Sequence, residues 1–112
     1  MRLEQVELPG NILKVKLQGS LDLAGAEEIE LPFSVICNKW NKVIVELTNV
    51  TFLASIGIRL LVKAARALGS KKGRLIVFNP TDDTRRVLRS TGIDTIIPVV
   101  ADEGAAIAAC AR

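Results

Sequence analysis

Apolar and polar residues alternate at the start of the chain. Residues 13–17 (LKVKL) place three apolar side chains on one face and two lysines on the other, which predicts a half-buried β-strand. Residues 3–8 (LEQVEL) alternate more loosely and predict a second strand. The intervening Pro9-Gly10-Asn11 favours a tight turn, so we expect the two strands to form an antiparallel hairpin.

Two short apolar runs further along predict strands that are buried on both faces. They are residues 43–47 (VIVEL) and 75–78 (LIVF). Between them, apolar residues recur at intervals of three and four over residues 55–69, with basic residues on the opposite side. This spacing predicts an amphipathic helix that ends at Gly69.

Residues 24–38 also have a helical pattern, but this segment contains Pro32. A proline inside a helix removes a hydrogen bond and clashes with the preceding turn, at a cost of about 3 kcal/mol. We therefore expect a break or kink near Leu31.

The last third of the chain predicts two more helices. One follows the Asn79-Pro80-Thr81 segment, with Asn79 or Thr81 as its cap, runs through Ser90 and is ended by Gly92. Residues 96–100 predict a short edge strand and residues 102–109 a final helix. A hairpin followed by alternating strands and helices predicts an α/β domain with a mixed sheet and right-handed parallel crossovers.

Composition narrows the function classes. The 112 residues suffice for one domain, which we assign to residues 1–112, and 49% hydrophobic with 24% charged residues is typical of a folded protein. Histidine is absent, which excludes Ser-His-Asp and Cys-His catalysis and histidine metal ligation. Adjacent carboxylates point in different directions on a helix, so no acid–base pair is evident. We expect no enzyme activity, no cofactor and no metal site.

Charge and aromatic content argue against nucleic acid as a partner. The net charge is only +3, and Phe33, Trp40, Phe52 and Phe78 do not cluster into a stacking surface. The densest basic group, residues 71–74, is interpreted as a solvated loop.

The two cysteines and the apolar segments point to a cytoplasmic protein. Cys37 and Cys110 lie far apart in apolar stretches, so we expect buried, reduced thiols. No charged-then-apolar leader occurs and no apolar run approaches the length of a membrane span, so we expect no membrane insertion.

The most informative stretch is residues 50–62 (VTFLASIGIRLLV), which joins a strand to a helix. Ser55 is predicted at the N-cap, beside backbone amides that the first helical turn leaves unpaired. A serine here can cap the helix or accept a phosphoryl group, because free amides and the helix dipole favour an anion. Geometry alone favours the cap.

The segment Leu53-Ala54-Ser55-Ile56-Gly57-Ile58-Arg59 resembles the signature loop of STAS domains, the family of bacterial anti-sigma factor antagonists. The usual pattern there is an apolar residue followed by Asp-Ser-Ser/Thr-Gly-Leu-Gly. Residues 17–22 (LQGSLD) resemble the family's L-x-G-x-L-D segment, and residues 74–77 and 87–93 match its later strand and helix. The order and spacing of these weak motifs make the resemblance specific.

The resemblance implies a STAS-like fold with four to five strands and about four helices, packed mainly on one face of the sheet. It also implies partner switching, in which the domain binds an anti-sigma factor of the serine kinase type and is released when that kinase phosphorylates the loop serine. A serine/threonine phosphatase would reset the switch. The resemblance leaves open whether the domain forms a homodimer. Partner-binding candidates on this basis are Asp22, Ala54, Ser55, Ile56, Gly57 and Arg59, with Ser55 as the phosphoacceptor.

Three departures from the family pattern bear on the switch. Ala54 replaces an aspartate, Ile56 replaces the second hydroxyl residue and Arg59 replaces a glycine. Arg59 lies four residues after Ser55, so it can pair with a phosphate there or stand as an exposed arginine on the polar helix face.

Other residues have two interpretations each. Asp22 is either a local helix cap or part of the partner-facing rim, and Trp40 either anchors a partner or covers the edge of the core. The function also has alternatives. The alternatives to an anti-sigma factor antagonist are a STAS scaffold without phosphorylation, a transport-complex subunit, and a small-molecule-binding module with an anion at the Ser55 helix terminus.

Overall fold

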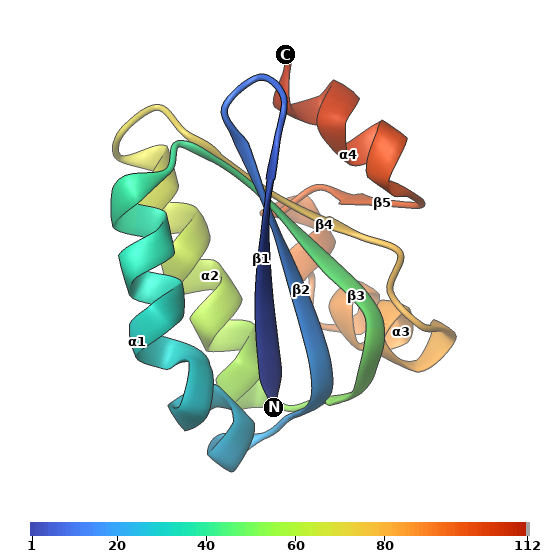
Figure 1. The fold of residues 1–112 in the computed structure, drawn as a ribbon. Helices are drawn as coiled ribbons and strands as arrows, with labels where there is room; N and C mark the ends of the chain where they lie inside the picture. Colours follow the sequence, from blue (N-terminus) through green and yellow to red (C-terminus); the bar gives the residue numbers. More distant parts are fainter. Residues whose placement is uncertain (112) are drawn as a thin grey trace.

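Five strands form one sheet, in the order in which they follow one another along the chain (Figure 1). The computed structural model describes residues 1–111. The strands are β1 (Arg2–Leu8), β2 (Ile12–Leu21), β3 (Lys42–Leu53), β4 (Arg74–Phe78) and β5 (Val99–Val100). β1 pairs antiparallel with β2, and every later neighbouring pair is parallel. The predicted mixed sheet with an N-terminal hairpin is confirmed.

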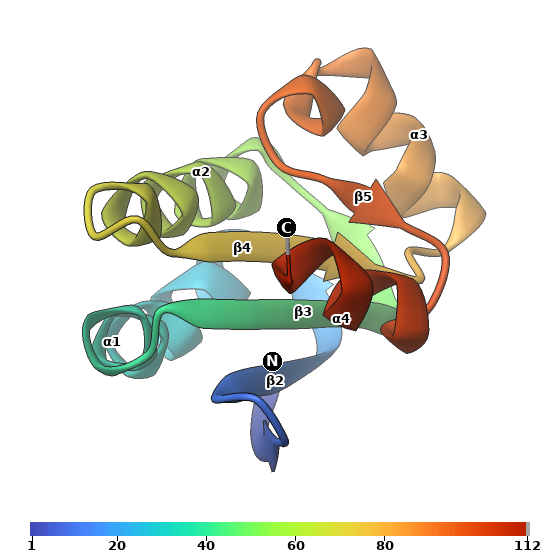
Figure 2. The same cartoon turned by 90° about the horizontal axis from the view of Figure 1, so that it is seen from above.

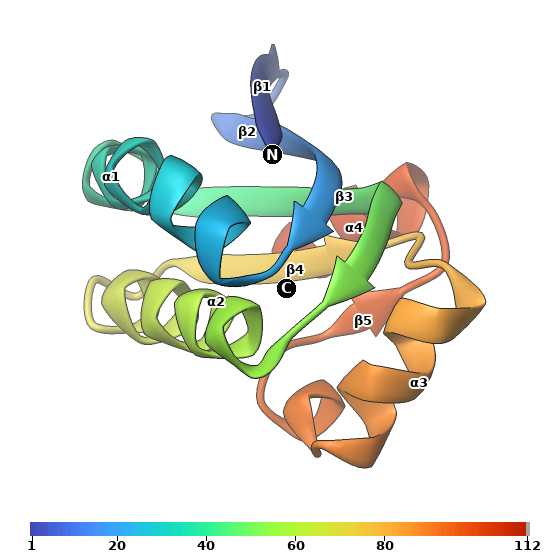
Figure 3. The same cartoon turned by 90° about the horizontal axis from the view of Figure 1, so that it is seen from below.

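Four helices and one short 3₁₀ turn connect or follow the strands: α1 (Leu23–Lys39), α2 (Ser55–Gly69), α3 (Asp82–Ser90), the 3₁₀ turn Ile93–Thr95 and α4 (Glu103–Cys110). α1 and α2 lie side by side, and α3 packs into the same hydrophobic cluster (Figures 1 and 3). α4 packs into a separate cluster against β3 and β4 (Figure 2). The helices thus lie mainly on one face, as predicted.

The hairpin turn forms where expected. Gly10 and Asn11 adopt φ values of +86° and +58°, a region that glycine and asparagine tolerate better than other residues. Leu8 pairs with Ile12 immediately outside the turn. β2 and β3 are longer than predicted, since β2 continues to Leu21 and β3 to Leu53.

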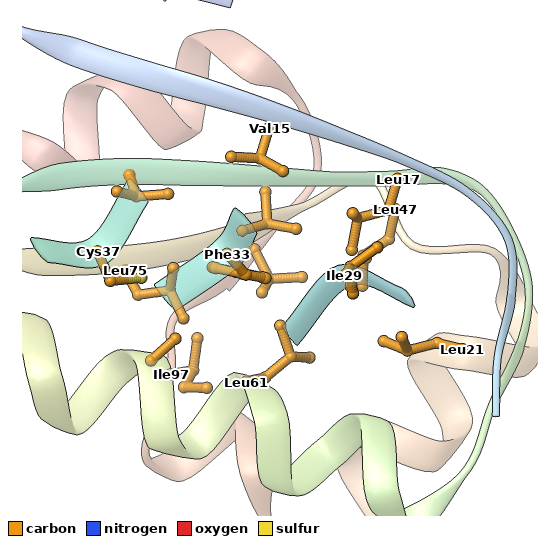
Figure 4. Packing of buried hydrophobic residues seen from close by; sticks show 14 of the residues in the cluster. Val15, Leu17, Leu21, Ile29, Phe33, Cys37, Leu47, Leu61, Leu75 and Ile97 are labelled. Atoms are coloured by element: carbon orange, nitrogen blue, oxygen red, sulfur yellow. The ribbon is translucent and has the colours of Figure 1, made fainter. Parts of the chain in front are cut away.

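The central strand β3 is buried on both of its faces, as the apolar run predicted. Val43 and Val45 belong to the large cluster under α1 and α2, whereas Ile44 belongs to the cluster under α4. Phe33 on α1 and Leu61 on α2 fill the space between helices and sheet (Figure 4). Burying each such side chain contributes about 1.5–3 kcal/mol, so this two-sided packing is the main source of stability.

α1 runs without interruption through Pro32, so the predicted break near Leu31 is wrong. Pro32 lies on the exposed side of the helix, as does Glu28 one turn earlier. The hydrogen bond that proline cannot donate is therefore lost on the side where water can reach the free carbonyl, while Ile29 and Phe33 hold the opposite side in the core.

The C-terminal elements follow the prediction in outline. Thr81 rather than Asn79 caps α3, because its hydroxyl oxygen accepts a hydrogen bond from the Thr84 amide at 3.2 Å. Gly92 ends that segment with φ +76°. The predicted edge strand is reduced to Val99–Val100, and α4 begins after Asp102, whose carboxylate accepts from the Ala105 amide at 2.8 Å. Cys37 and Cys110 are both buried free thiols, as predicted.

The basic group after α2 does more than face solvent, which corrects the interpretation of residues 71–74 as a solvated loop. The Lys71 ammonium donates to the carbonyls of Cys37, Asn38 and Trp40 at 2.7, 3.0 and 3.2 Å. These carbonyls are at the C-terminal end of α1, where they lack partners within the helix. Lys71 therefore caps α1 and ties it to the α2–β4 loop.

In the described residues, 1–111, every helix is too short or too polar to cross a lipid bilayer.

We expect Lys71→Met to lower the free energy of unfolding by about 1–2 kcal/mol, because it removes charge-assisted hydrogen bonds from three carbonyls. Lys72→Met is the matched control, since the Lys72 side chain makes no hydrogen bond or ion pair within residues 1–111. Lys72 has a φ of +63°, and Lys and Met, both unbranched at Cβ, should tolerate it to a similar degree. Urea denaturation measures both. Equal losses in the two variants would contradict the capping role.

Candidate functional site

The candidate site lies where the carboxyl end of β3 leads into α2, beside the carboxyl end of β2. The Ala54 amide donates to the Leu21 carbonyl at 3.0 Å, which ties the β3–α2 loop to the end of β2. Leu21 and Leu53 are register partners in the parallel pair. This contact brings the segments before α1 and before α2 to one end of the sheet (Figure 3).

Ser55 is the first residue of α2 and not its N-cap, so the predicted cap role is wrong. Ala54 occupies the N-cap with φ −92° and ψ 168°, and its carbonyl accepts the first helical hydrogen bond, from the Ile58 amide at 3.1 Å. The bond from Ala54 to Leu21 and the packing of Gly57 set this register. Ser55 is exposed, and its hydroxyl makes no hydrogen bond with any residue of 1–111.

Gly57 is buried where α2 crosses the end of β2. A Cβ atom at this position would lie 2.5 Å from Leu21 Cγ and 2.9 Å from the Leu21 carbonyl oxygen. Only glycine permits this approach. Gly57 therefore positions the loop rather than offering a surface of its own.

Asp22 is the N-cap of α1. Its carboxylate accepts a hydrogen bond from the Gly25 amide at 2.8 Å, which confirms the local-cap interpretation. Asp22 directly follows Leu21, so the cap also holds the start of α1 beside the Ser55 loop.

Two exposed apolar side chains flank the site, and the sequence did not identify either. Phe52 in β3 is 55% exposed, and Leu23 at the start of α1 is 61% exposed. We predicted this strand to end at Leu47, so Phe52, which is exposed between buried Val50 and Leu53 in the C-terminal part of β3, lay outside the expected strand.

A groove of about 310 Å³ separates α1 from α2 and reaches the site. Its walls include Ile56 and Leu60, and Glu27 and Glu30 of α1 face Arg59 and Lys63 of α2 across it. Lys63 pairs with Glu30 at 3.8 Å. Arg59 is exposed and has no ion pair with any residue of 1–111.

Cys37 and Trp40 serve the core. Burial raises the pKa of the Cys37 thiol to about 11, although nearby Lys71 lowers it in part, so the thiol is protonated at neutral pH. Trp40 is half-buried and packs against the main cluster, which confirms that it covers the edge of the core.

The model of the STAS domain family matches residues 5–106. The chain belongs to the STAS domain family. The family predicted from the Ser55 loop is thus confirmed over most of the chain. A relative of known sequence is BtrV of Bordetella bronchiseptica, named as a candidate anti-sigma factor antagonist, which is 27% identical over 110 residues covering 97% of this chain and 94% of BtrV.

Solved structures show the same fold. A candidate anti-sigma factor antagonist from Thermotoga maritima has a TM-score of 0.90 at 20% identity, covering 98% of this chain and 95% of that one. An anti-sigma factor antagonist from Mycobacterium paratuberculosis has a TM-score of 0.84 at 24% identity, with 99% and 96% coverage. The Bacillus protein SpoIIAA in its phosphorylated form has a TM-score of 0.74 at 24% identity, with 99% and 100% coverage.

We expect Gly57→Ala to lower the free energy of unfolding by about 1–3 kcal/mol, because the new methyl group overlaps Leu21 and shifts α2 or β2. Gly69→Ala in the same helix is the control. No atom of residues 1–111 lies within 4 Å of its added Cβ, so it should raise stability by about 0.5–1 kcal/mol. Thermal unfolding measures both, and a neutral Gly57→Ala would refute the tight contact.

Proposed function

We propose that this STAS domain is a cytoplasmic anti-sigma factor antagonist that docks a kinase-type anti-sigma factor through the surface around Ser55. The supporting observation is the state of Ser55 itself. Its hydroxyl is exposed, makes no hydrogen bond with residues 1–111 and stands at the first position of a 15-residue helix. A serine that does not cap its helix is free to accept a phosphoryl group.

The surroundings of Ser55 suit a protein partner. Leu23 at the start of α1 and Phe52 near the end of β3 are large apolar side chains that are exposed at the same end of the sheet as the loop. An exposed apolar patch with a polar rim is typical of a docking surface. Ala54 and Ile56 add apolar surface where the usual family pattern has polar residues. In this proposal these residues contact the partner, while Asp22 and Gly57 position the loop.

Phosphorylation would release the partner. Transfer of the γ-phosphoryl group of ATP to Ser55 Oγ yields ADP and a proton, and leaves about −1.5 to −2 charges on the docking surface. A charge of this size cannot be buried against apolar side chains without a large desolvation cost. The N-terminus of α2 tolerates it in the free protein, since the helix dipole favours an anion there. A serine/threonine phosphatase would restore the hydroxyl.

A second function is favoured by Ala54 and Ile56. With one hydroxyl residue left in the loop and no aspartate beside it, the same surface could serve as a permanent docking site in a scaffold or a transport complex. Mass spectrometry of the protein from its native host distinguishes the two functions. Phosphate on the peptide that contains Ser55 supports the switch, whereas its absence through growth and stress conditions supports permanent docking.

We expect Ser55→Asp to weaken binding to the purified anti-sigma factor by at least about tenfold, since it places a carboxylate in the docked surface, where burying the charge costs free energy. The variant should remain folded, because an acidic residue in the first turn of a helix is stabilising by about 0.3–1 kcal/mol. Isothermal titration calorimetry gives the affinity and thermal unfolding gives the stability.

Ser90→Asp is the control, because Ser90 is an exposed serine at the end of α3. It should leave the affinity unchanged. Full binding by Ser55→Asp would rule out docking through this loop.

A further inference from the structure

Arg59 is placed to reach a phosphate on Ser55. The two residues are four apart in α2, so they lie on one face of the helix, separated by about 6 Å along its axis. Both are exposed. Within residues 1–111, neither the Ser55 hydroxyl nor the Arg59 guanidinium makes a hydrogen bond or an ion pair, so neither has to break one for the two to meet.

Lys63, the next basic residue along this side of α2, forms an ion pair within residues 1–111, whereas Arg59 does not. Lys63, one turn further along α2, pairs with Glu30 across the groove at 3.8 Å. Glu27 and Arg59 line the same groove one turn earlier, and neither forms an ion pair with any residue of 1–111. Among these residues, no carboxylate holds the Arg59 guanidinium away from the candidate phosphoacceptor.

The backbone supplies further donors. The first turn of α2 begins at Ser55, and within residues 1–111 the amides of Ser55, Ile56 and Gly57 donate no hydrogen bond. A phosphate on Ser55 thus meets unpaired amides on one side and a guanidinium on the other. Guanidinium and phosphate form strong, bidentate, charge-assisted hydrogen bonds.

We propose that Arg59 holds the phosphate group of phosphorylated Ser55 and so acts as the positioning residue of the modified state. This inference rests on the proposed function, because it concerns the phosphorylated form. In the unmodified protein Arg59 is free to contact the partner at the edge of the docking surface. Phosphorylation then changes that surface twice, by adding negative charge and by withdrawing a cation.

The charged groups around the phosphate act in opposite directions. Arg59 and the α2 dipole favour the dianion, whereas Asp22 and Glu27 on the adjoining α1 disfavour it. The two carboxylates are present in every variant below, so their influence cancels when variants are compared.

The test installs phosphoserine at position 55 by genetic encoding, which requires no kinase, and follows the phosphate by ³¹P NMR as pH is varied. Arg59→Ala should raise the second pKa of the phosphate by about 0.15–0.4 units, because losing one i,i+4 ion pair costs about 0.2–0.5 kcal/mol and one pKa unit corresponds to about 1.4 kcal/mol. Arg59→Lys should restore most of that shift, because it keeps the positive charge.

Arg66→Ala is the matched control. Arg66 is exposed on the same face of α2, eleven residues from Ser55, which is about 16 Å along the helix axis and beyond the screening length of about 8–10 Å. It should leave the phosphate pKa unchanged. An Arg59→Ala variant that titrates like the wild type, or one that titrates like Arg66→Ala, would overturn the inference.

The design separates this inference from the proposed function. If the native protein never carries phosphate on Ser55 but the encoded phosphoserine responds to Arg59, the switch fails and the pairing stands. If native phosphate is found but Arg59→Ala has no effect on its titration, the switch stands and the pairing fails.

Discussion

The structure depends on the contact between Leu21 and the start of α2. Gly57 lies against the Leu21 side chain, and the Ala54 amide donates to the Leu21 carbonyl. These two contacts fix where the helix begins relative to the end of the sheet. One consequence is chemical, because they assign the N-cap to Ala54, a residue with no capping side chain. Ser55 is thereby left with an exposed hydroxyl that makes no capping hydrogen bond with the helix.

Two-sided burial of the central strands supports this arrangement. β3 and β4 place alternate side chains in the cluster beneath α1 and α2 and in the cluster beneath α4, so both strands are held from two directions. A core of this kind keeps the strand ends rigid. Loops at the carboxyl ends of such strands can then carry exposed apolar and polar groups without endangering the fold, and the Ser55 loop is one of them.

The electrostatics of the α1–α2 groove link the site to the rest of the surface. Glu27 and Glu30 of α1 face Arg59 and Lys63 of α2, and within residues 1–111 the only ion pair that crosses the groove joins Glu30 to Lys63. Arg59 is thus available to the phosphoryl group or to a partner. In the proposed switch, a phosphoryl group on Ser55 would add negative charge at the end of this groove, beside Arg59.

The sequence by itself determined the hairpin, the buried strands, the extent of α2 and the family, and it directed the proposal to Ser55. Those conclusions rest on local signals, namely periodicity, turn residues and motif spacing. Tertiary structure alone decided that Pro32 is accommodated within α1, that Lys71 caps it and that Ser55 stands one position past the cap. Each depends on which side of an element faces the core or on a residue distant in the chain, and no local pattern contains that information.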